Sequence, residues 1–267
     1  MSNFTKISSK YESDSIVQRS ASEILLELLD IQDNDNILDL GCGTGHIAQL
    51  IKEKTNGTVV GVDPAKGMIE EATKKYSDYG ISFRNLSVEQ LDYQNEFDAI
   101  FCNSVFQWFS NPGIALEKCH KALNFNGKIA IQAPAKKNYC PNFIEAINAV
   151  ERDPLTRDTF SRFTSPWFFL ETADDYQKLF EDTGFSVSKS NLERVATYHS
   201  LEEVFNIFES GAAAGYLNQQ FYKKKLPESY PDRFRKIINN TFSDQVGQTG
   251  TIELVFYRIY LLAAKEA

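Results

Sequence analysis

The sequence predicts an α/β protein with one doubly wound, seven-stranded sheet, whose last strand is antiparallel, and a helical insertion ahead of that strand. Over the first two-thirds of the chain, short apolar runs alternate with helical patterns, which is typical of a parallel sheet covered on both faces. A glycine-rich turn joins the first such pair, and a long segment, 200–242, separates the last two strands. The length of 267 residues suits one domain of roughly 200 or more residues with an insertion as well as two smaller domains.

Five strands are expected in the first half of the chain, each a short run of aliphatic or β-branched residues. They cover residues 37–40, 58–62, 81–83, 97–102 and 128–133. Helices are predicted where apolar residues recur every three or four positions, over 20–29, 45–55, 67–76 and 112–123. Pro112 suits the first turn of the last of these helices.

Two more helices, over 142–150 and 173–183, are expected after the fifth strand, and Gly184 can end the second of them. A sixth strand follows at 185–189, and the final strand, 253–264, is predicted to run antiparallel at the edge of the sheet. The chain is therefore divided into an N-terminal lid segment with the first helix (1–35), an α/β core (36–199), a helical, aromatic-rich lid insertion (200–245) and the final strand of the core (246–267).

Composition excludes several classes of protein. A hydrophobic content of 42% and a charged content of 24% exclude wholesale disorder. No apolar run approaches the roughly 20 residues that span a bilayer, and the polar start lacks the apolar region of a secretory signal, so we expect a cytoplasmic protein. Four widely spaced cysteines argue against a disulfide framework or a zinc site, and the net charge of −8 disfavours nucleic-acid binding.

The turn after the first strand has the residues expected of a ligand-binding site. Its glycines remove Cβ atoms where the backbone turns and approaches a ligand, and the following helix start offers N–H donors; they are Gly41, Gly43 and Gly45. Asp63, 22 residues after Gly41, ends the second strand, where a carboxylate can accept hydrogen bonds from a ribose diol. Dinucleotide sites favour G-x-G-x-x-G, whereas this turn is G-x-G-x-G. Asp39 just before it would repel a pyrophosphate and attract an ammonium group.

Four segments, 39–45, 62–68, 97–103 and 123–127, resemble the ordered motifs of class I S-adenosylmethionine-dependent methyltransferases, and the resemblance spans about residues 11–188. It implies a Rossmann-like methyltransferase sheet with S-adenosylmethionine as cofactor and S-adenosylhomocysteine as product. Three scattered histidines and the lack of a metal-spaced carboxylate cluster leave no obvious metal site, so no metal is expected. By this resemblance the three glycines line the methionine part and Asp39 faces its amino group. Asp63 holds the ribose, Met68 packs on the adenine, and the backbone of Ser87 and Val88 meets the adenine edge.

The same resemblance places four further residues in the cofactor site: Tyr11, Cys42, Pro64 and Asn103. Ser87 departs from the family pattern, because an aspartate often stands there and contacts the adenine amino group. We therefore expect that contact to be weaker or to be supplied differently.

Two segments narrow the range of possible methyl acceptors. Residues 11–19 and 103–108 resemble parts of malonyl-carrier-protein, trans-aconitate and juvenile-hormone-acid methyltransferases, which esterify carboxylates. This resemblance implies that Gln18 and Trp108 orient the acceptor carboxylate. Such an acceptor, with a pKa of ~4, is already anionic at neutral pH and needs no general base, so catalysis is mainly positioning. The three histidines, His46, His120 and His199, are accordingly interpreted as structural or solvent-facing.

Other side chains could complete an acceptor pocket. Arg162 and Arg258 lie among aromatic residues and could bind a carboxylate, or each could pair with a surface acid. Tyr11, Phe106 and Trp108 could provide an aromatic wall, although core packing is the competing interpretation for Phe106. Free or carrier-bound acids are both compatible acceptors. Methylation of a phenol, amine or carbon, a non-catalytic cofactor-binding protein and, remotely, an NAD-dependent dehydrogenase remain alternatives.

The insertion carries two distinctive features. Nine aromatic residues fall within 45 residues, enough to cover a site at the carboxyl edge of the sheet; they are Tyr198, Phe205, Phe208, Tyr216, Phe221, Tyr222, Tyr230, Phe234 and Phe242. Residues 222–236 contain six basic side chains against two acidic ones, 6 − 2 = +4. This basic segment, from Lys223 to Lys236, is either a solvated helix face or a docking surface for an acidic partner such as an acyl carrier protein.

Overall fold

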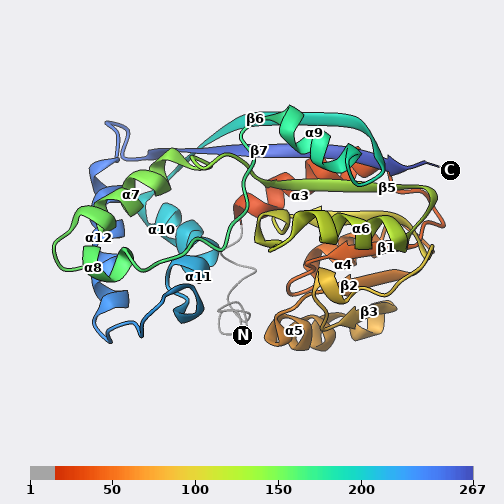
Figure 1. Ribbon diagram of the computed structural model, residues 1–267, viewed down its shortest axis with the longest axis horizontal. Helices are drawn as coiled ribbons and strands as arrows, with labels where there is room; N and C mark the ends of the chain where they lie inside the picture. The colour runs from red at the N-terminus through yellow and green to blue at the C-terminus, as the bar shows by residue number, and fades with distance from the viewer. Residues whose placement is uncertain (1–15, 267) are drawn as a thin grey trace. The chain divides into compact units, whose positions relative to one another are not determined.

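The computed structural model describes residues 16–266, with the backbone alone described for residues 16–20. The chain divides into two units (Figure 1). The first comprises the described residues up to Lys136 together with Trp167–Glu193 and the end of the chain from Arg258. The second comprises Lys137–Pro166 and Arg194–Tyr257. It therefore contains residues 137–166, which the division made from the sequence keeps with the core.

The seven predicted strands are all present and form one sheet in the order β3-β2-β1-β4-β5-β7-β6. They are β1 Ile37–Leu40, β2 Val59–Val62, β3 Ile81–Arg84, β4 Phe97–Asn103, β5 Leu123–Pro134, β6 Phe185–His199 and β7 Ile252–Lys265. Strands β1 to β5 pair in parallel, and β7 is antiparallel to β5, as predicted. The strand order reverses at β1, which lies between β2 and β4. In open α/β sheets, ligands bind at the carboxyl ends of the strands at such a point.

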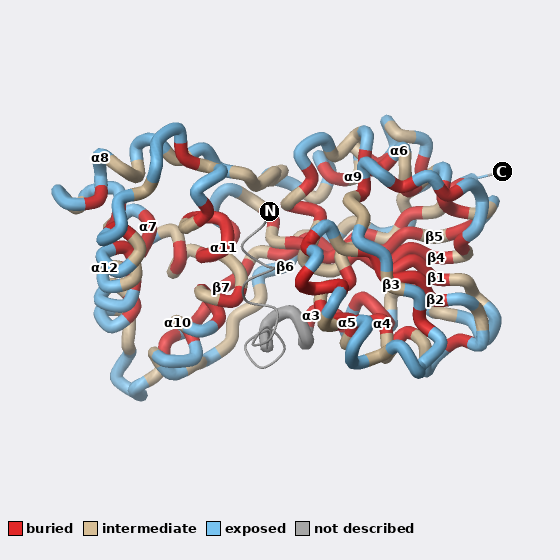
Figure 2. Tube along the Cα trace, turned by 90° about the horizontal axis from the view of Figure 1, so that it is seen from below, coloured by how far each residue is buried: buried red, intermediate tan, exposed pale blue. Residues whose placement is uncertain are grey.

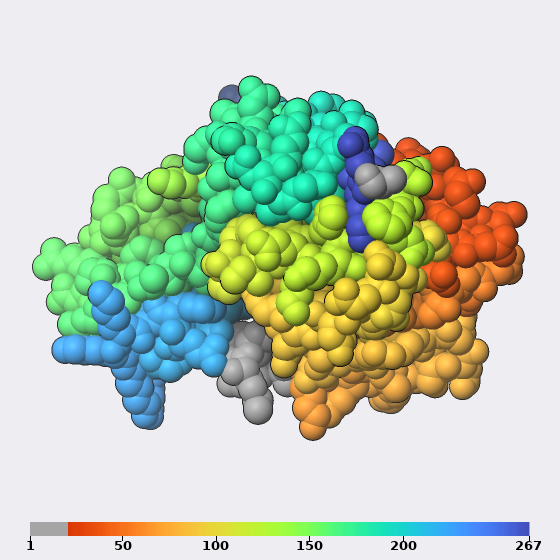
Figure 3. All heavy atoms as spheres, turned by 45° about the vertical axis from the view of Figure 1, so that its right-hand side comes forward, coloured from red at the N-terminus to blue at the C-terminus, as the bar shows by residue number. Residues whose placement is uncertain are grey.

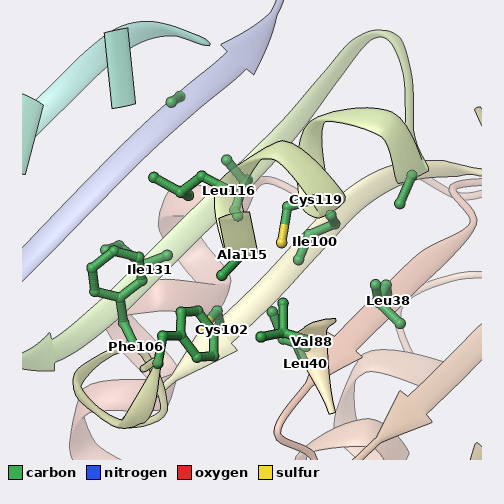
Figure 4. Packing of buried hydrophobic residues seen from close by; sticks show 14 of the residues in the cluster. Leu38, Leu40, Val88, Ile100, Cys102, Phe106, Ala115, Leu116, Cys119 and Ile131 are labelled. Atoms are coloured by element: carbon green, nitrogen blue, oxygen red, sulfur yellow. The ribbon is translucent and has the colours of Figure 1, made fainter. Parts of the chain in front are cut away.

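Helices cover both faces of the sheet in the first unit. They are α3 Ile16–Leu29, α4 His46–Lys52, α5 Lys66–Tyr76, α6 Pro112–Ala122 and α9 Ala173–Glu181. Because side chains alternate along a strand, Leu38 and Leu40 pack on the face with α6 and α9, whereas Ile37 packs on the face with α3 and α4. Figure 2 shows the central strands buried, and Figure 4 shows the first of these two clusters.

The predicted place of the last strand was wrong, because β7 lies between β5 and β6 and β6 forms the edge. The residues of β7 are mostly buried, as expected for a strand with a neighbour on each side. By contrast, nearly all residues of β6 are exposed or half-buried, which an edge strand tolerates. It also continues to His199, ten residues beyond the predicted end at Lys189.

The second unit contains helices α7 Pro141–Arg152, α8 Arg157–Phe160, α10 Leu201–Ser210, α11 Ala213–Tyr216 and α12 Tyr230–Asp244. Six of the nine aromatics that are expected to cover a site are buried; they are Phe208, Tyr216, Tyr222, Tyr230, Phe234 and Phe242. The Phe208 ring lies 5.1 Å from Phe143 and 5.8 Å from Phe242, between ring centroids. A unit this small needs large aromatic side chains to bury enough apolar surface. None of the helices within residues 16–266 is long and apolar enough to cross a membrane.

Candidate cofactor site

The glycine turn after β1 adopts a backbone that other residues rarely adopt. Gly41, Gly43 and Gly45 have φ angles of 77°, 53° and 85°. The main-chain nitrogens of Gly41 and Cys42 both donate to the carbonyl of Val62, at 2.8 and 3.0 Å, which fixes the turn to the end of β2. A Cβ atom on Gly41 would lie 2.2 Å from Cγ2 of Val105. Glycine is therefore required at position 41 by both conformation and space.

Asp63 follows β2 and links that strand to the glycine turn. The main-chain nitrogen of Gly43 donates to its Oδ2 at 3.1 Å, and that of Ala65 donates to its Oδ1 at 2.7 Å. Burial raises the pKa of this carboxyl to about 6, and the two backbone hydrogen bonds oppose the rise. Each carboxylate oxygen still has a lone pair with which it could accept a further hydrogen bond.

Asp39 is the most unusual residue of the site. It is 2% exposed on β1, and its Oδ2 has no hydrogen-bond partner among the described residues. Burial, and then the nearby charge of Asp63, raise the pKa of Asp39 to about 8. A buried carboxyl with an unused oxygen is costly unless a partner compensates it. A cationic donor such as an ammonium group would supply that compensation.

The thiols of Cys42 and Cys102 are buried near these carboxyls. Burial, followed by the charge of Asp39 or of a neighbouring cysteine, raises the pKa of both thiols. Both thiols therefore remain protonated at neutral pH, as expected for small packing residues rather than nucleophiles.

The loop after β4 lies against the glycine turn through Val105. Phe106, in the same loop, is buried, and its ring lies 5.8 Å from that of Phe180 and 5.3 Å from that of Phe109. Figure 4 shows Phe106 within the core cluster. The prediction that Phe106 could line an acceptor pocket is therefore replaced by its competing interpretation as a core residue.

Trp108 is half-buried and packs edge-to-face on Trp167, with 5.4 Å between the ring centroids. It lies in a single 3₁₀ turn, Phe106–Trp108, that follows the carboxyl end of β4. The ring thus belongs to the loop that packs on the glycine turn.

Comparison with known proteins identifies the family of the chain. A model of the methyltransferase domain family matches residues 31–184, more than half of the chain. The malonyl-[acyl-carrier protein] O-methyltransferase of Priestia megaterium is 31% identical over 270 residues, which cover 96% of this chain and 94% of that protein. The chain belongs to the S-adenosylmethionine-dependent methyltransferases.

Two further relatives carry related names. The malonyl-[acyl-carrier protein] O-methyltransferase of Acetivibrio thermocellus is 29% identical over 131 residues, 48% of this chain and 46% of that protein. The chain thus spans about half the length of that relative. The trans-aconitate 2-methyltransferase of an Enterobacter species is 24% identical over 253 residues, 93% of each chain.

Solved structures show the same fold. The YcgJ protein of Bacillus subtilis superposes with a TM-score of 0.61 at 16% identity, covering 92% of this methyltransferase and 97% of that chain. The 1,6-didemethyltoxoflavin-N1-methyltransferase of Burkholderia thailandensis, solved with S-adenosylhomocysteine, gives a TM-score of 0.55 at 16% identity, covering 97% and 82%. At these identities the likeness concerns the fold alone.

The remaining predicted cofactor residues of the methyltransferase lie at the ends of other elements. Met68 is buried in α5 and Val88 is buried in a short 3₁₀ turn, whereas Pro64 is exposed and Asn103 ends β4 half-buried. The main-chain nitrogen of Ser87 donates to Oε1 of Gln90 at 2.9 Å. That N–H group is therefore already engaged within its own turn.

Four other predicted residues are placed less completely. Tyr11 lies outside the described residues, and Gln18 lies in α3 with its side chain outside the description. Arg258 is buried on β7, opposite Pro134 of β5, and belongs to the first unit. Arg162 is exposed and belongs to the second unit. Within residues 16–266, no cluster of three or more histidine, cysteine or acidic side chains is arranged to hold a metal ion.

Sequence reasoning missed three residues that shape the site. Val105 closes the space above Gly41, and Ser104 has a left-handed backbone with a φ of 59°. Gln132, in β5, is 1% exposed and hydrogen-bonded to Ser104. A lone amide in the otherwise apolar run 129–133 is a signal that could have drawn attention to Gln132.

Proposed function

We propose that this methyltransferase transfers the methyl group to a carboxylate oxygen and so forms a methyl ester of a small acid or of a carrier-bound acyl group. The contact of Val105 with Gly41 carries the proposal, because it puts the loop of Trp108 directly against the turn expected to hold the cofactor. The names of the malonyl-[acyl-carrier protein] and trans-aconitate relatives support a carboxylate acceptor.

The residues of the first unit fit a nucleoside that carries an amino acid. The uncompensated carboxyl of Asp39 would accept hydrogen bonds from the amino group, and the three glycines of the turn would allow close approach of the methionine part. Asp63 would accept from the ribose with its remaining lone pairs. Met68 and Val88 would contact the adenine, with Tyr11, Cys42, Pro64, Ser87 and Asn103 around the same ligand.

The bound S-adenosylmethionine supplies an electrophilic methyl group on a sulfonium. An acceptor carboxylate oxygen would form the new bond to the methyl carbon while the carbon–sulfur bond breaks and its electron pair stays on sulfur. No proton moves, so the absence of a general base among the proposed acceptor residues is consistent with this chemistry. Because the charges of the acceptor carboxylate and of the sulfonium are both neutralised in this step, a site that excludes water favours it.

Positioning is then the main task of the protein. Trp108 would hold the acceptor by its indole, and Gln18 would donate to the carboxylate from α3. Arg258 and Arg162 are the candidate cationic partners for an acceptor with a second acidic group.

A product assay tests the carboxylate proposal. The purified enzyme is incubated with methyl-labelled S-adenosylmethionine and matched acceptors that carry a carboxylate, a phenol or an amine. We expect label in products that lose methanol in mild alkali. Labelled product that is stable to alkali, formed on the phenol or the amine, would overturn the proposal.

A carrier-protein substrate is supported by the basic segment of the second unit. Lys223, Lys224, Lys225, Arg233 and Lys236 are all exposed. Arg235 differs, because its Nε donates to both carboxylate oxygens of Glu209 at 2.9 and 3.1 Å. In Figure 3 the light-blue part of the chain around these lysines projects from the surface. We infer that this segment docks an acidic carrier protein, which long-range charge attraction would steer to it.

A further inference from the structure

The first residue after β4 has a conformation that needs support. Ser104 has a φ of 59°, a left-handed backbone that non-glycine residues rarely adopt. Such a conformation is energetically unfavourable and persists where the surroundings enforce it. Ser104 begins the loop that carries Val105 and Trp108, so its backbone sets the direction of that loop.

Gln132 provides the support from the neighbouring strand. The main-chain nitrogen of Ser104 donates to the carbonyl of Gln132 at 2.7 Å, and its hydroxyl donates to Oε1 of Gln132 at 3.0 Å. Both donors of Ser104 therefore end on one residue. Gln132 is 1% exposed and stands opposite Asn103 in the register of β4 and β5.

A second amide extends the support toward the tryptophans. Nε2 of Gln107 donates to the carbonyl of Ser104 at 2.9 Å, and the main-chain nitrogen of Phe168 donates to the carbonyl of Gln107 at 2.8 Å. Phe168 follows Trp167, whose ring packs on Trp108. A continuous series of hydrogen bonds thus leads from Gln132 to the segments that hold both indoles.

Burying an amide between Ile131 and Ala133 is costly unless its polar atoms are used. An aliphatic residue would fill the same position on β5 at lower cost. The use of glutamine is therefore best explained by what its oxygen holds, which is the hydroxyl of Ser104.

We propose that Gln132 is a positioning residue for methyl transfer, which acts through Ser104 to hold Trp108 in place for the acceptor. It acts at a distance, because its hydrogen bonds reach the loop and not the ligand. The proposal rests on the acceptor role proposed for Trp108. One part of the proposal is structural, namely that Gln132 fixes the Trp108 ring. This part can be tested without any acceptor.

The chain contains only two tryptophans, so its intrinsic fluorescence reports on this loop directly. In a Trp167→Phe background, the emission and the acrylamide quenching of Trp108 are measured for Gln132→Met and Ser104→Ala. We expect quenching to increase at least twofold in both. Ile131→Val, a mild change of the adjacent core residue on β5, serves as the control for general loosening. Quenching equal to that of the background protein, or an equal rise in the control, would overturn the proposal.

Kinetics of the two-tryptophan enzyme then test the link to function. We expect Gln132→Met to lower kcat/KM for the acceptor at least tenfold while the Kd for S-adenosylhomocysteine changes less than twofold. Ser104→Gly in the Gln132→Met background should restore part of the loss, because glycine adopts the left-handed backbone without support. An unchanged kcat/KM beside altered quenching would overturn the functional link. If Trp108→Phe itself leaves the acceptor kinetics unchanged, the proposed role of Trp108 fails, whereas the quenching result still stands.

Discussion

Oδ2 of Asp63 accepts a hydrogen bond from the main-chain nitrogen of Gly43 at 3.1 Å. The acid at the end of β2 therefore holds the glycine turn as well as offering lone pairs to a ribose. Because the main-chain nitrogen of Ala65 occupies the other oxygen, the carboxylate is fixed in one orientation before a ligand arrives. Preorganisation of this kind reduces the entropic cost of binding.

Asp63→Asn is expected to weaken cofactor binding. One oxygen becomes an NH₂ group, so the side chain cannot accept from both Gly43 and Ala65 and also from a ribose. We expect the Kd for S-adenosylhomocysteine, measured by calorimetry, to rise at least tenfold. Glu70→Gln is the control, since Glu70 makes an exposed ion pair with Lys66 on α5. Equal affinities of the wild-type and Asp63→Asn proteins would contradict the assignment.

Gly41→Ala is expected to destabilise the protein more than Gly80→Ala. Both glycines have similar positive φ angles, 77° and 72°, but a Cβ at position 80 would meet nothing within 4 Å. Gly80→Ala should therefore lower the free energy of unfolding by about 1 kcal/mol, from backbone strain alone. Gly41→Ala adds the clash with Val105 and should lower it by about 3 kcal/mol or more.

Urea unfolding of both glycine variants measures this difference. Val105→Ala in the Gly41→Ala background should recover part of the loss, because it removes the two methyl groups nearest to the added Cβ. Equal losses for the two single variants would show that Val105 moves aside without cost.

The stability of the unliganded protein is expected to decrease as the pH rises from 6 to 8. The pKa of Asp39 is about 8 in the folded protein and near 3.8 in the unfolded chain, so the folded state binds an extra proton between these values. The free energy of unfolding therefore falls with increasing pH across this range, and the raised pKa of Asp63, about 6, adds to the fall near its lower end.

Asp39→Asn separates the stability effect from the binding effect. The variant has no carboxyl to ionise, so at pH 8 its free energy of unfolding should exceed that of the wild type by several kcal/mol. Its affinity for S-adenosylhomocysteine should fall at least tenfold, since the partner of the ammonium group is lost. Thermal melts at pH 6, 7 and 8, with and without ligand, measure both. A wild-type Tm independent of pH would rule out the raised pKa.

Reversing the charge of the basic segment is expected to impair the methylation of carrier-bound substrates but not of free acids. The triple change of Lys223, Lys224 and Lys225 to glutamate should raise the KM for a carrier-bound acid about tenfold, with a weaker salt dependence than the wild type. The KM for a small free acid should not change. The control reverses three exposed lysines elsewhere, Lys54, Lys74 and Lys121, for the same change in net charge. Equal effects of the two triple variants would argue against a specific docking surface.

The local elements follow from short stretches of the sequence alone. They depend on the spacing of residues along short segments such as the strand 37–40 and the glycines after it. The structure has a strand at residues 37–40, and the three glycines after it have positive φ angles. Such patterns are readable because each residue's surroundings are set by its near neighbours in the chain.

Tertiary structure decided which distant segments meet. The place of β7 between β5 and β6, the contact of Val105 with Gly41 and the support of Ser104 by Gln132 each join residues far apart in the chain. The nine aromatics of residues 198–242 illustrate the same limit, since six of them are buried in the second unit. A local pattern records that a side chain is apolar or polar, but its partner is fixed only by strand order and packing, which no single segment encodes.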